Sequence, residues 1–237
     1  MKFRKHALAA RTPQVGSWPR RRNALPTVKS SQMTSYKFLI YLLAGWSGYF
    51  VMALELLGGR ALGPYFGSGI YVWGAIITLF MLSLSIGYLI GGSLSTARPS
   101  LRKLSAILLL AVLAALPCVL AQNTILEFIF DRVPDPRYGA LCASVALFFL
   151  PITVSGAVSP YAVRLLVDGL GTSGQVAGKV FFVSTLGSTL GTLLTSFYLV
   201  LFFELDQILV GMMAISFSTG VAGLLFHQGG TKNAATA

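Results

Sequence analysis

Long apolar segments alternate with short polar or charged segments along the chain after residue 37. Six of the apolar segments approach 20 residues with few or no charges, which is the length that crosses a bilayer as an α-helix. The predicted spans are residues 38–57, 70–94, 104–121, 140–163, 176–203 and 208–226. The pattern therefore predicts an all-α, polytopic membrane protein. Its domains are a basic, mobile tail (1–37), a six-helix transmembrane domain (38–228) and a short polar tail (229–237).

Two connecting segments carry local structural signals. Gly58 and Gly59 follow the first apolar segment, and we expect them to end that helix. Residues 123–137 surround an ILEFIF core with acids and bases, and we expect this core to lie flat at the membrane interface.

The composition excludes an ordinary soluble domain. Hydrophobic residues make up 55% of the chain, charged residues 11%, and the mean hydropathy is +0.75. A soluble domain usually carries about 25% charged residues. The lipid bilayer is therefore a predicted partner, and the predicted location is the cell membrane, which is the inner membrane in a bacterium.

The positive charge is concentrated at the N-terminus. The formal net charge is +11, and half of the 18 Lys and Arg residues fall within residues 1–37. Beside a membrane span, such a tail sets topology or contacts anionic lipid, so we expect no nucleic-acid partner. The loops after the second and fourth spans are also basic or balanced, whereas those after the first, third and fifth are neutral or acidic. This alternation predicts that both termini are cytoplasmic.

Glu55 and Arg60 lie at the rim of the first span. They could form an ion pair that locks the hairpin between the first two spans. Alternatively they could contact a substrate or ion, since ionisable groups within membranes are commonly functional. The sequence leaves both interpretations open.

The fourth span contains two helix-breaking residues, Pro151 and Pro160, with Ser155, Gly156 and Ser159 between them. Each proline removes a helical hydrogen bond, and the freed carbonyls need polar neighbours. The five residues are candidates for a broken helix that lines a cavity. The alternative is a plain kink whose carbonyls are satisfied by neighbouring helices.

Two GxxxG pairs, Gly87 with Gly91 and Gly187 with Gly191, have the spacing that lets helix backbones approach closely. The polar residues near the second pair are Ser184, Ser188 and Thr192. Helix packing is the favoured interpretation, and a polar permeation stripe is the alternative.

No arrangement typical of an enzyme is apparent. The chain lacks an HExxH motif and a Ser-His-Asp set, and Cys118 and Cys142 lie in apolar segments as expected of buried side chains. A formal GxGxxG at residues 169–174 follows a membrane span rather than a strand, so we interpret it as a loop. We expect no catalytic residue, metal or cofactor.

Four stretches together resemble the membrane domain of the spermidine-synthase-like membrane proteins, often labelled fused MFS/spermidine synthase. They are LELLGGRALGPYFGSGIYVWG, GYLIGG, PITVSGAVSPYAVRLL and GQVAGKVFFVSTLGSTLGTLL. One position departs from the pattern: Ser184 stands where the family tends to have asparagine in an NTLG motif. The resemblance implies a six-span fold and, by association, polyamine chemistry.

Members of that family typically add a cytosolic aminopropyltransferase-like domain. Residues 227–237 alone follow the last predicted span, so we expect this chain to lack that domain. The leading hypothesis is a non-catalytic membrane subunit that acts with a partner protein, such as a soluble synthase-like protein or a membrane complex. The alternative is a transporter or exporter of a small solute, with a polyamine as one candidate.

Overall fold

The computed structural model describes residues 30–167 and 169–235, so the predicted tail up to residue 29 lies outside the described part of the chain. The described residues form α-helices, one 3₁₀ turn and one π-helical stretch, with no strand. The elements are α1 (Ser30–Phe66), α2 (Ile70–Leu94), α3 (Leu101–Ala115), α4 (Pro117–Leu120), α5 (Gln122–Arg132), α6 (Pro136–Gly156), α7 (Val158–Leu166), the 3₁₀ turn η1 (Leu170–Thr172), α8 (Ser173–Leu194), the π-helical η2 (Thr195–Leu199), α9 (Val200–Phe202) and α10 (Leu205–Ala235).

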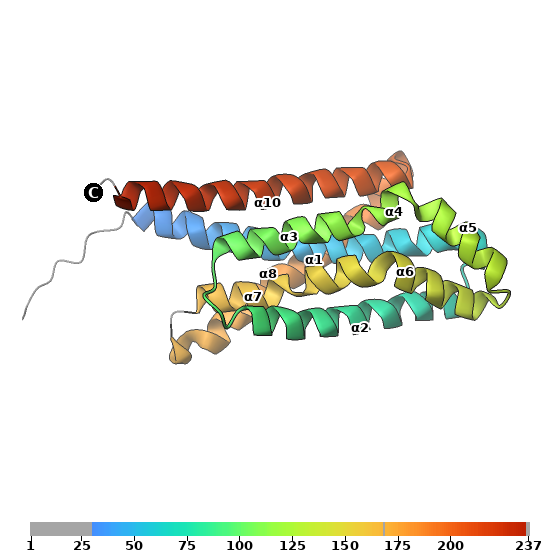
Figure 1. Ribbon diagram of the computed structural model, residues 1–237, viewed down its shortest axis with the longest axis horizontal. Helices are drawn as coiled ribbons and strands as arrows, with labels where there is room; N and C mark the ends of the chain where they lie inside the picture. Colours follow the sequence, from blue (N-terminus) through green and yellow to red (C-terminus); the bar gives the residue numbers. More distant parts are fainter. Residues whose placement is uncertain (1–29, 168, 236–237) are drawn as a thin grey trace, which may run out of the picture.

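Six helical segments of the described chain are long and apolar enough to cross a bilayer. They are Ser35–Phe66, Ile70–Leu94, Leu101–Leu120, Pro136–Leu166, Ser173–Phe202 and Leu205–Leu225. Figure 1 shows these segments side by side in one elongated bundle, with the start of α1 and the end of α10 at the same end. The predicted all-α fold with six transmembrane helices is confirmed.

The first helix does not end at Gly58 and Gly59, as the sequence suggested. These glycines let aromatic rings approach α1, because an added Cβ would lie 3.0 Å from the ring of Phe148 at Gly58 and 2.6 Å from that of Trp73 at Gly59. The helix ends instead before Gly67, whose φ of +83° is the left-handed conformation that favours glycine after a helix. The sequence prediction was wrong because glycine both terminates helices and allows them to pack closely.

Other helix boundaries also differ from the prediction. α1 begins at Ser30 and α10 extends to Ala235, so part of each predicted tail is helical. The third span begins at Leu101, after the Ser100 side chain accepts a hydrogen bond from the amide of Lys103. Its helix is interrupted before Pro117, which cannot donate a backbone hydrogen bond.

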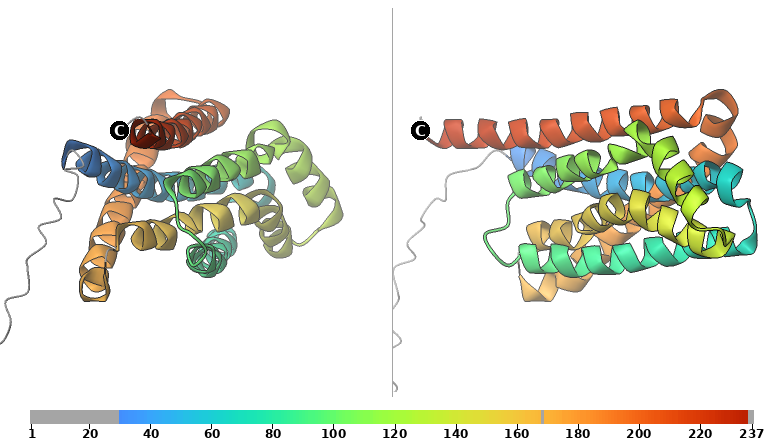
Figure 2. Two further views of the ribbon diagram at one scale, coloured as in Figure 1. Left: turned by 60° about the vertical axis from the view of Figure 1, so that its left-hand side comes forward. Right: turned by 45° about the vertical axis from the view of Figure 1, so that its right-hand side comes forward.

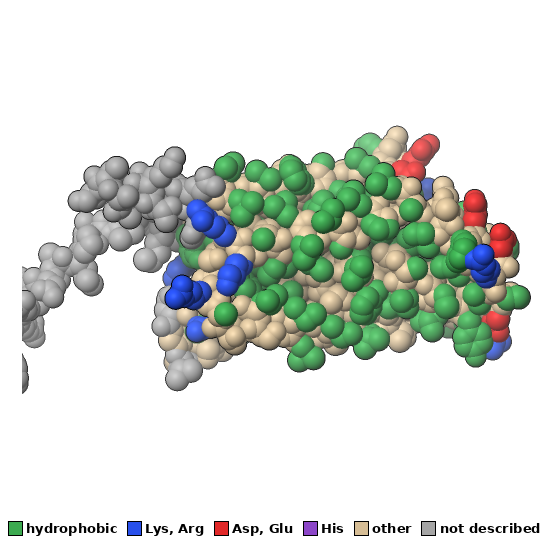
Figure 3. Space-filling view, viewed as in Figure 1, with side chains coloured by type: hydrophobic (Ala, Val, Ile, Leu, Met, Phe, Trp, Pro, Cys, Tyr) green, Lys and Arg blue, Asp and Glu red, His purple; other side chains and the backbone are tan. Residues whose placement is uncertain are grey.

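The charged residues separate along the bundle axis. Figure 3 shows basic side chains at the end that holds the described termini, and a mixture rich in acids at the other. The described basic residues of the first end, here called the basic end, are Lys37, Arg98, Arg102, Lys103, Arg164 and Lys179. The connections at the opposite end carry Glu127, Asp131, Arg132, Asp135, Arg137, Glu204 and Asp206. The asymmetry agrees with the loop charges, and the cytoplasmic location of the basic end stays a prediction.

The packing is uneven around the bundle. α1 packs along α8, α2 along α6, and α3 along α10. In the segment Pro136–Leu166, 61% of the most apolar stretch is buried inside the bundle, compared with 11% in Ser173–Phe202. Figure 2 accordingly shows α8 at the margin of the bundle.

Two further features are the short helix α5 and the two cysteines. α5 crosses the end of the bundle opposite the termini, with Leu126 buried and Phe128 exposed (Figure 1). Cys118 is buried and its thiol donates to the carbonyl of Leu147 at 3.3 Å. Cys142 is exposed on the outside of α6, so its predicted burial was wrong.

Candidate functional site

The fourth span is broken just before Pro160, whereas α6 continues through Pro151. α6 ends at Gly156 and α7 begins at Val158, and the amide of Ala157 bonds back to the carbonyl of Val154 at 3.2 Å. The helical partner of the Gly156 carbonyl would be the amide of residue 160, which is a proline without an N–H. The Gly156 carbonyl therefore lacks its usual helical donor at the break.

α2 packs directly against this break through its GxxxG pair. A Cβ at Gly87 would overlap the carbonyl oxygen of Thr153, and one at Gly91 would overlap that of Ala157. At Gly91 the same atom would lie 2.8 Å from the ring of Pro160. The two glycines thus bring α2 to backbone contact with the broken helix.

The second GxxxG pair brings α8 equally close to α1. A Cβ at Gly187 would overlap the carbonyl oxygen of Gly45, and one at Gly191 would lie 2.5 Å from that of Tyr49. On the α1 side, a Cβ at Gly48 would overlap the carbonyl oxygen of Ser184. Small residues at these contacts are typical of helix packing in membranes.

A polar cavity of about 70 Å³ lies where these helices meet. Besides Tyr88 of α2, its polar lining residues are serines from four helices: Ser47 of α1, Ser155 of α6, Ser159 of α7, and Ser184 and Ser188 of α8. The remaining lining residues are Gly48, Val51, Met52, Leu84 and Gly156. We refer to this site as the serine cavity.

The serine cavity lies deep in the membrane-spanning part of the bundle. Ser47 is 12 residues beyond Ser35, the start of its span, and Ser184 is 11 residues beyond Ser173. At 1.5 Å per residue these positions are roughly 17 Å from the basic end of the helices. That depth is about half the thickness of a hydrocarbon core of about 30 Å.

Hydrogen bonds between helices position the serines. Ser47 donates to the carbonyl of Ser155 at 3.0 Å, and Ser188 donates to the carbonyl of Gly48 at 3.2 Å. The hydroxyl oxygens of Ser159 and Ser184 are 3.4 Å apart. These contacts connect α1, α6, α7 and α8 around the cavity.

The same bonds leave the serine cavity richer in acceptors than in donors. The hydroxyl protons of Ser47 and Ser188 are directed to backbone carbonyls, and one proton lies between Ser159 and Ser184, so the remaining hydroxyl donors are those of Ser155, Tyr88 and one member of the Ser159–Ser184 pair. Each hydroxyl oxygen still has lone pairs that can accept. Together with the Gly156 carbonyl, they suit an occupant that donates hydrogen bonds or coordinates oxygen, such as a small cation or water.

The volume sets a limit on that occupant. An apolar cavity of about 150 Å³ holds one benzene molecule. The serine cavity has about half that volume, so it takes a few water molecules or one small cation. A whole polyamine exceeds it, although the amine end of such a molecule would fit.

Glu55 stands one helical turn beyond the α1 part of this lining. It follows Met52 by three residues and Val51 by four, which places it on the same face of α1. Its side chain is partly buried, and no hydrogen bond or ion pair joins its carboxyl group to another described residue. Glu55 is therefore a second acceptor group beside the serine cavity.

The proposed pairing of Glu55 with Arg60 is not formed. Five residues along one helix turn the side-chain direction by about 140°, so the two residues lie on different faces of α1. Arg60 is exposed and donates from Nη1 to the carbonyl of Val200 at 3.1 Å. The prediction of an ion pair that locks the hairpin was therefore wrong, because α1 continues as a helix through the expected turn.

The predicted site residues separate into two groups. Ser155, Gly156 and Ser159 line the serine cavity, whereas Pro151, which lies inside the continuous helix α6, and Pro160, which follows the break, do not line it. Sequence reasoning did not assign Ser47 to the site. It noted Ser184 and Ser188 as polar neighbours of a packing motif, without placing them opposite the broken helix.

Within the described residues, no cluster of three or more His, Cys, Asp or Glu side chains has the arrangement of a metal site. No protein-family model, no curated protein and no solved structure matches this chain. The resemblance to the spermidine-synthase-like membrane proteins therefore stays a prediction.

Proposed function

We propose that this chain is a non-catalytic membrane subunit that binds a small monovalent cation or a primary amine in the serine cavity and takes part in its passage across the membrane. The observation that carries the proposal is the acceptor-rich cavity at the α6–α7 break. Broken helices whose backbone oxygens face a cavity near the bilayer midplane are typical of solute sites in transporters.

The chemistry of the lining supports a cation over an anion. Four of the five serines are held in bonds that leave oxygen lone pairs available, and a carboxyl group follows on the same face of α1. An anion would find no positive charge there, because no Lys or Arg lines the cavity. Polar groups are also costly in lipid unless they are paired or functional.

Uptake into proteoliposomes tests this function. The purified chain is reconstituted, and uptake of radiolabelled methylammonium is compared with uptake into protein-free vesicles. We expect protein-dependent uptake that is reduced by Ser159→Ala and retained by Ser218→Ala. Ser218 is a matched control because it is exposed and bonds to the carbonyl of Ala214 within its own helix. Equal uptake with and without protein would contradict passage by this chain alone.

The second candidate is a scaffold subunit that positions a partner protein, as the resemblance implies. The sparse burial of the Ser173–Phe202 segment favours it, because α8 presents an apolar face beyond its contact with α1. Leu186 and Leu190 belong to that exposed face. A protein that copurifies from native membranes and is lost when both are replaced by tryptophan would support the scaffold. Its retention in that variant would count against α8 as the docking face.

A further inference from the structure

A second site lies at the basic end, outside the serine cavity. It is an open groove of about 450 Å³ between the first part of α8 and α1. Its lining residues are Tyr41 of α1 and Gln175, Gly178, Lys179, Phe182 and Val183 of α8. The volume falls within the range of about 300–1,000 Å³ that is common for small-molecule sites.

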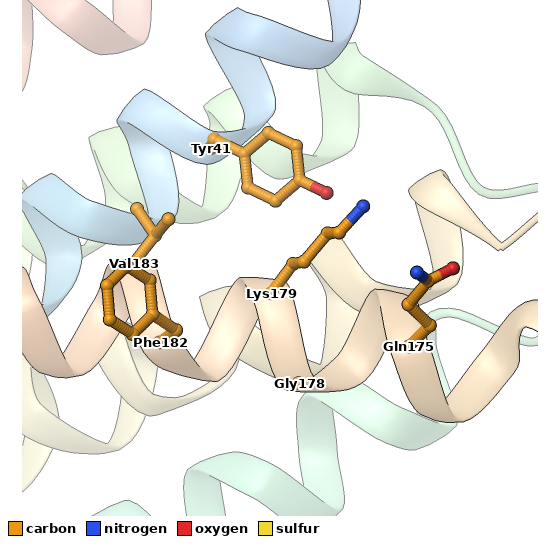
Figure 4. A pocket seen from close by; sticks show the side chains of 6 residues that line it. All are labelled: Tyr41, Gln175, Gly178, Lys179, Phe182 and Val183. Atoms are coloured by element: carbon orange, nitrogen blue, oxygen red, sulfur yellow. The ribbon is translucent and has the colours of Figure 1, made fainter.

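The groove changes character along its length. Figure 4 shows the hydroxyl of Tyr41, the ammonium of Lys179 and the amide of Gln175 directed toward one end. The side chains of Phe182 and Val183 lie at the other end. Ser173 begins the apolar segment of α8, so the polar end of the groove lies nearer the start of that segment, and Phe182 and Val183 lie one turn beyond Lys179.

The change from a polar to an apolar lining matches a phospholipid, which has a polar headgroup and apolar acyl chains. A phosphate at the interface would accept from Lys179, Tyr41 and Gln175, while an acyl chain would cover Phe182 and Val183. Gly178 leaves room for it, since an added Cβ there would meet no atom within 4 Å.

The basic residues around the groove favour an anionic phospholipid over a neutral one. Lys179 is exposed, and it shares its end of the bundle with Arg102 and other basic residues. Basic residues near a membrane surface attract anionic lipid. We propose that the groove formed by Tyr41, Gln175, Gly178 and Lys179 is a binding site for one anionic phospholipid.

The test uses the full chain in vesicles of phosphatidylglycerol and phosphatidylcholine in equal amounts. After extraction in detergent, native mass spectrometry counts the lipids that stay bound. We expect the wild type to retain phosphatidylglycerol in preference to phosphatidylcholine. Lys179→Gln should lower that retention about five-fold, which corresponds to the roughly 1 kcal/mol of one basic residue near an anionic surface.

Two control variants distinguish lipid binding in the groove from nonspecific attraction of anionic lipid to the basic end. Arg102→Gln removes the same charge from the same end, and we expect less than about a two-fold loss because Arg102 does not line the groove and its attraction is screened by salt. Gly178→Leu keeps every charge and fills the groove, and it should abolish the preference. Gly74→Leu places the same side chain at an open glycine on α2 and should retain it.

The outcomes are decisive in either direction. Equal losses in the Lys179 and Arg102 variants, or full retention in Gly178→Leu, would overturn the site. Absence of any preference in the wild type would also overturn it. If Lys179→Gln does not fold, Gly178→Leu and Tyr41→Phe provide the same comparison with the charge intact.

Discussion

The guanidinium of Arg60 donates a hydrogen bond to the carbonyl oxygen of Val200, with Nη1 and O 3.1 Å apart. Arg60 lies near the end of α1, and Val200 begins α9, immediately after the π-helical η2. The bond therefore ties the ends of the first and fifth spans together. A basic side chain is also favourable beside helix carbonyls that have lost their partners.

This relationship predicts different roles for Arg60 and Glu55. Arg60→Gln should lower stability by on the order of 1 kcal/mol or less, because the bond is exposed. Glu55→Gln should not lower the melting temperature in detergent, since its carboxyl group has no partner among the described residues. The double variant should show the sum of the two effects. A double variant that is more stable than this sum would instead indicate a direct Glu55–Arg60 pair.

The close contact of α8 with α1 gives a second prediction. Gly187→Ala places a Cβ against the carbonyl oxygen of Gly45, which belongs to backbone and cannot rotate away. Overpacking of this kind costs about 1–3 kcal/mol. We expect the melting temperature in detergent to fall by on the order of 5 °C.

Gly178→Ala is the matched control on the same helix. Its added Cβ meets open space, and alanine favours the helix over glycine, so the melting temperature should be equal to or slightly above that of the wild type. A Gly187→Ala protein as stable as this control would show that the α1–α8 contact is looser than described.

The helical segments could be predicted from hydrophobicity alone, whereas the helix ends could not. Gly58 and Gly59 gave the same turn signal as Gly67, and only the rings of Phe148 and Trp73 show that the first two serve packing. The predicted Glu55–Arg60 pair depended on that false turn. Without it, helix geometry alone separates the two side chains.

Part of the serine cavity could be predicted from the prolines of the fourth span. Pro160 indicated where the fourth span would break, and Ser155 and Ser159 lie at that break, whereas Pro151 gave the same signal inside a continuous helix. Ser47 could not be assigned, because its role depends on which face of α1 meets α6, and this is a tertiary contact. The spacing of residues within each helix does not show which helices pack against each other.

The charge separation predicts the orientation of the bundle. The basic end should be cytoplasmic, because Lys and Arg are retained on that side of the membrane. Reporter fusions after Asp135 and after Asp206 should therefore both report the outside. A cytoplasmic signal from either fusion would contradict this topology.

The most direct test of the account is equilibrium binding of methylammonium to the purified protein. We predict saturable binding with one site per chain, weakened about ten-fold or more by Ser155→Ala and by Ser159→Ala, since a hydrogen bond to a charged group contributes about 1.5–3 kcal/mol. Ser218→Ala, which alters a serine outside the cavity, should bind like the wild type. Binding that is equally strong in all four proteins, or absent from the wild type, would contradict the serine cavity as the cation site.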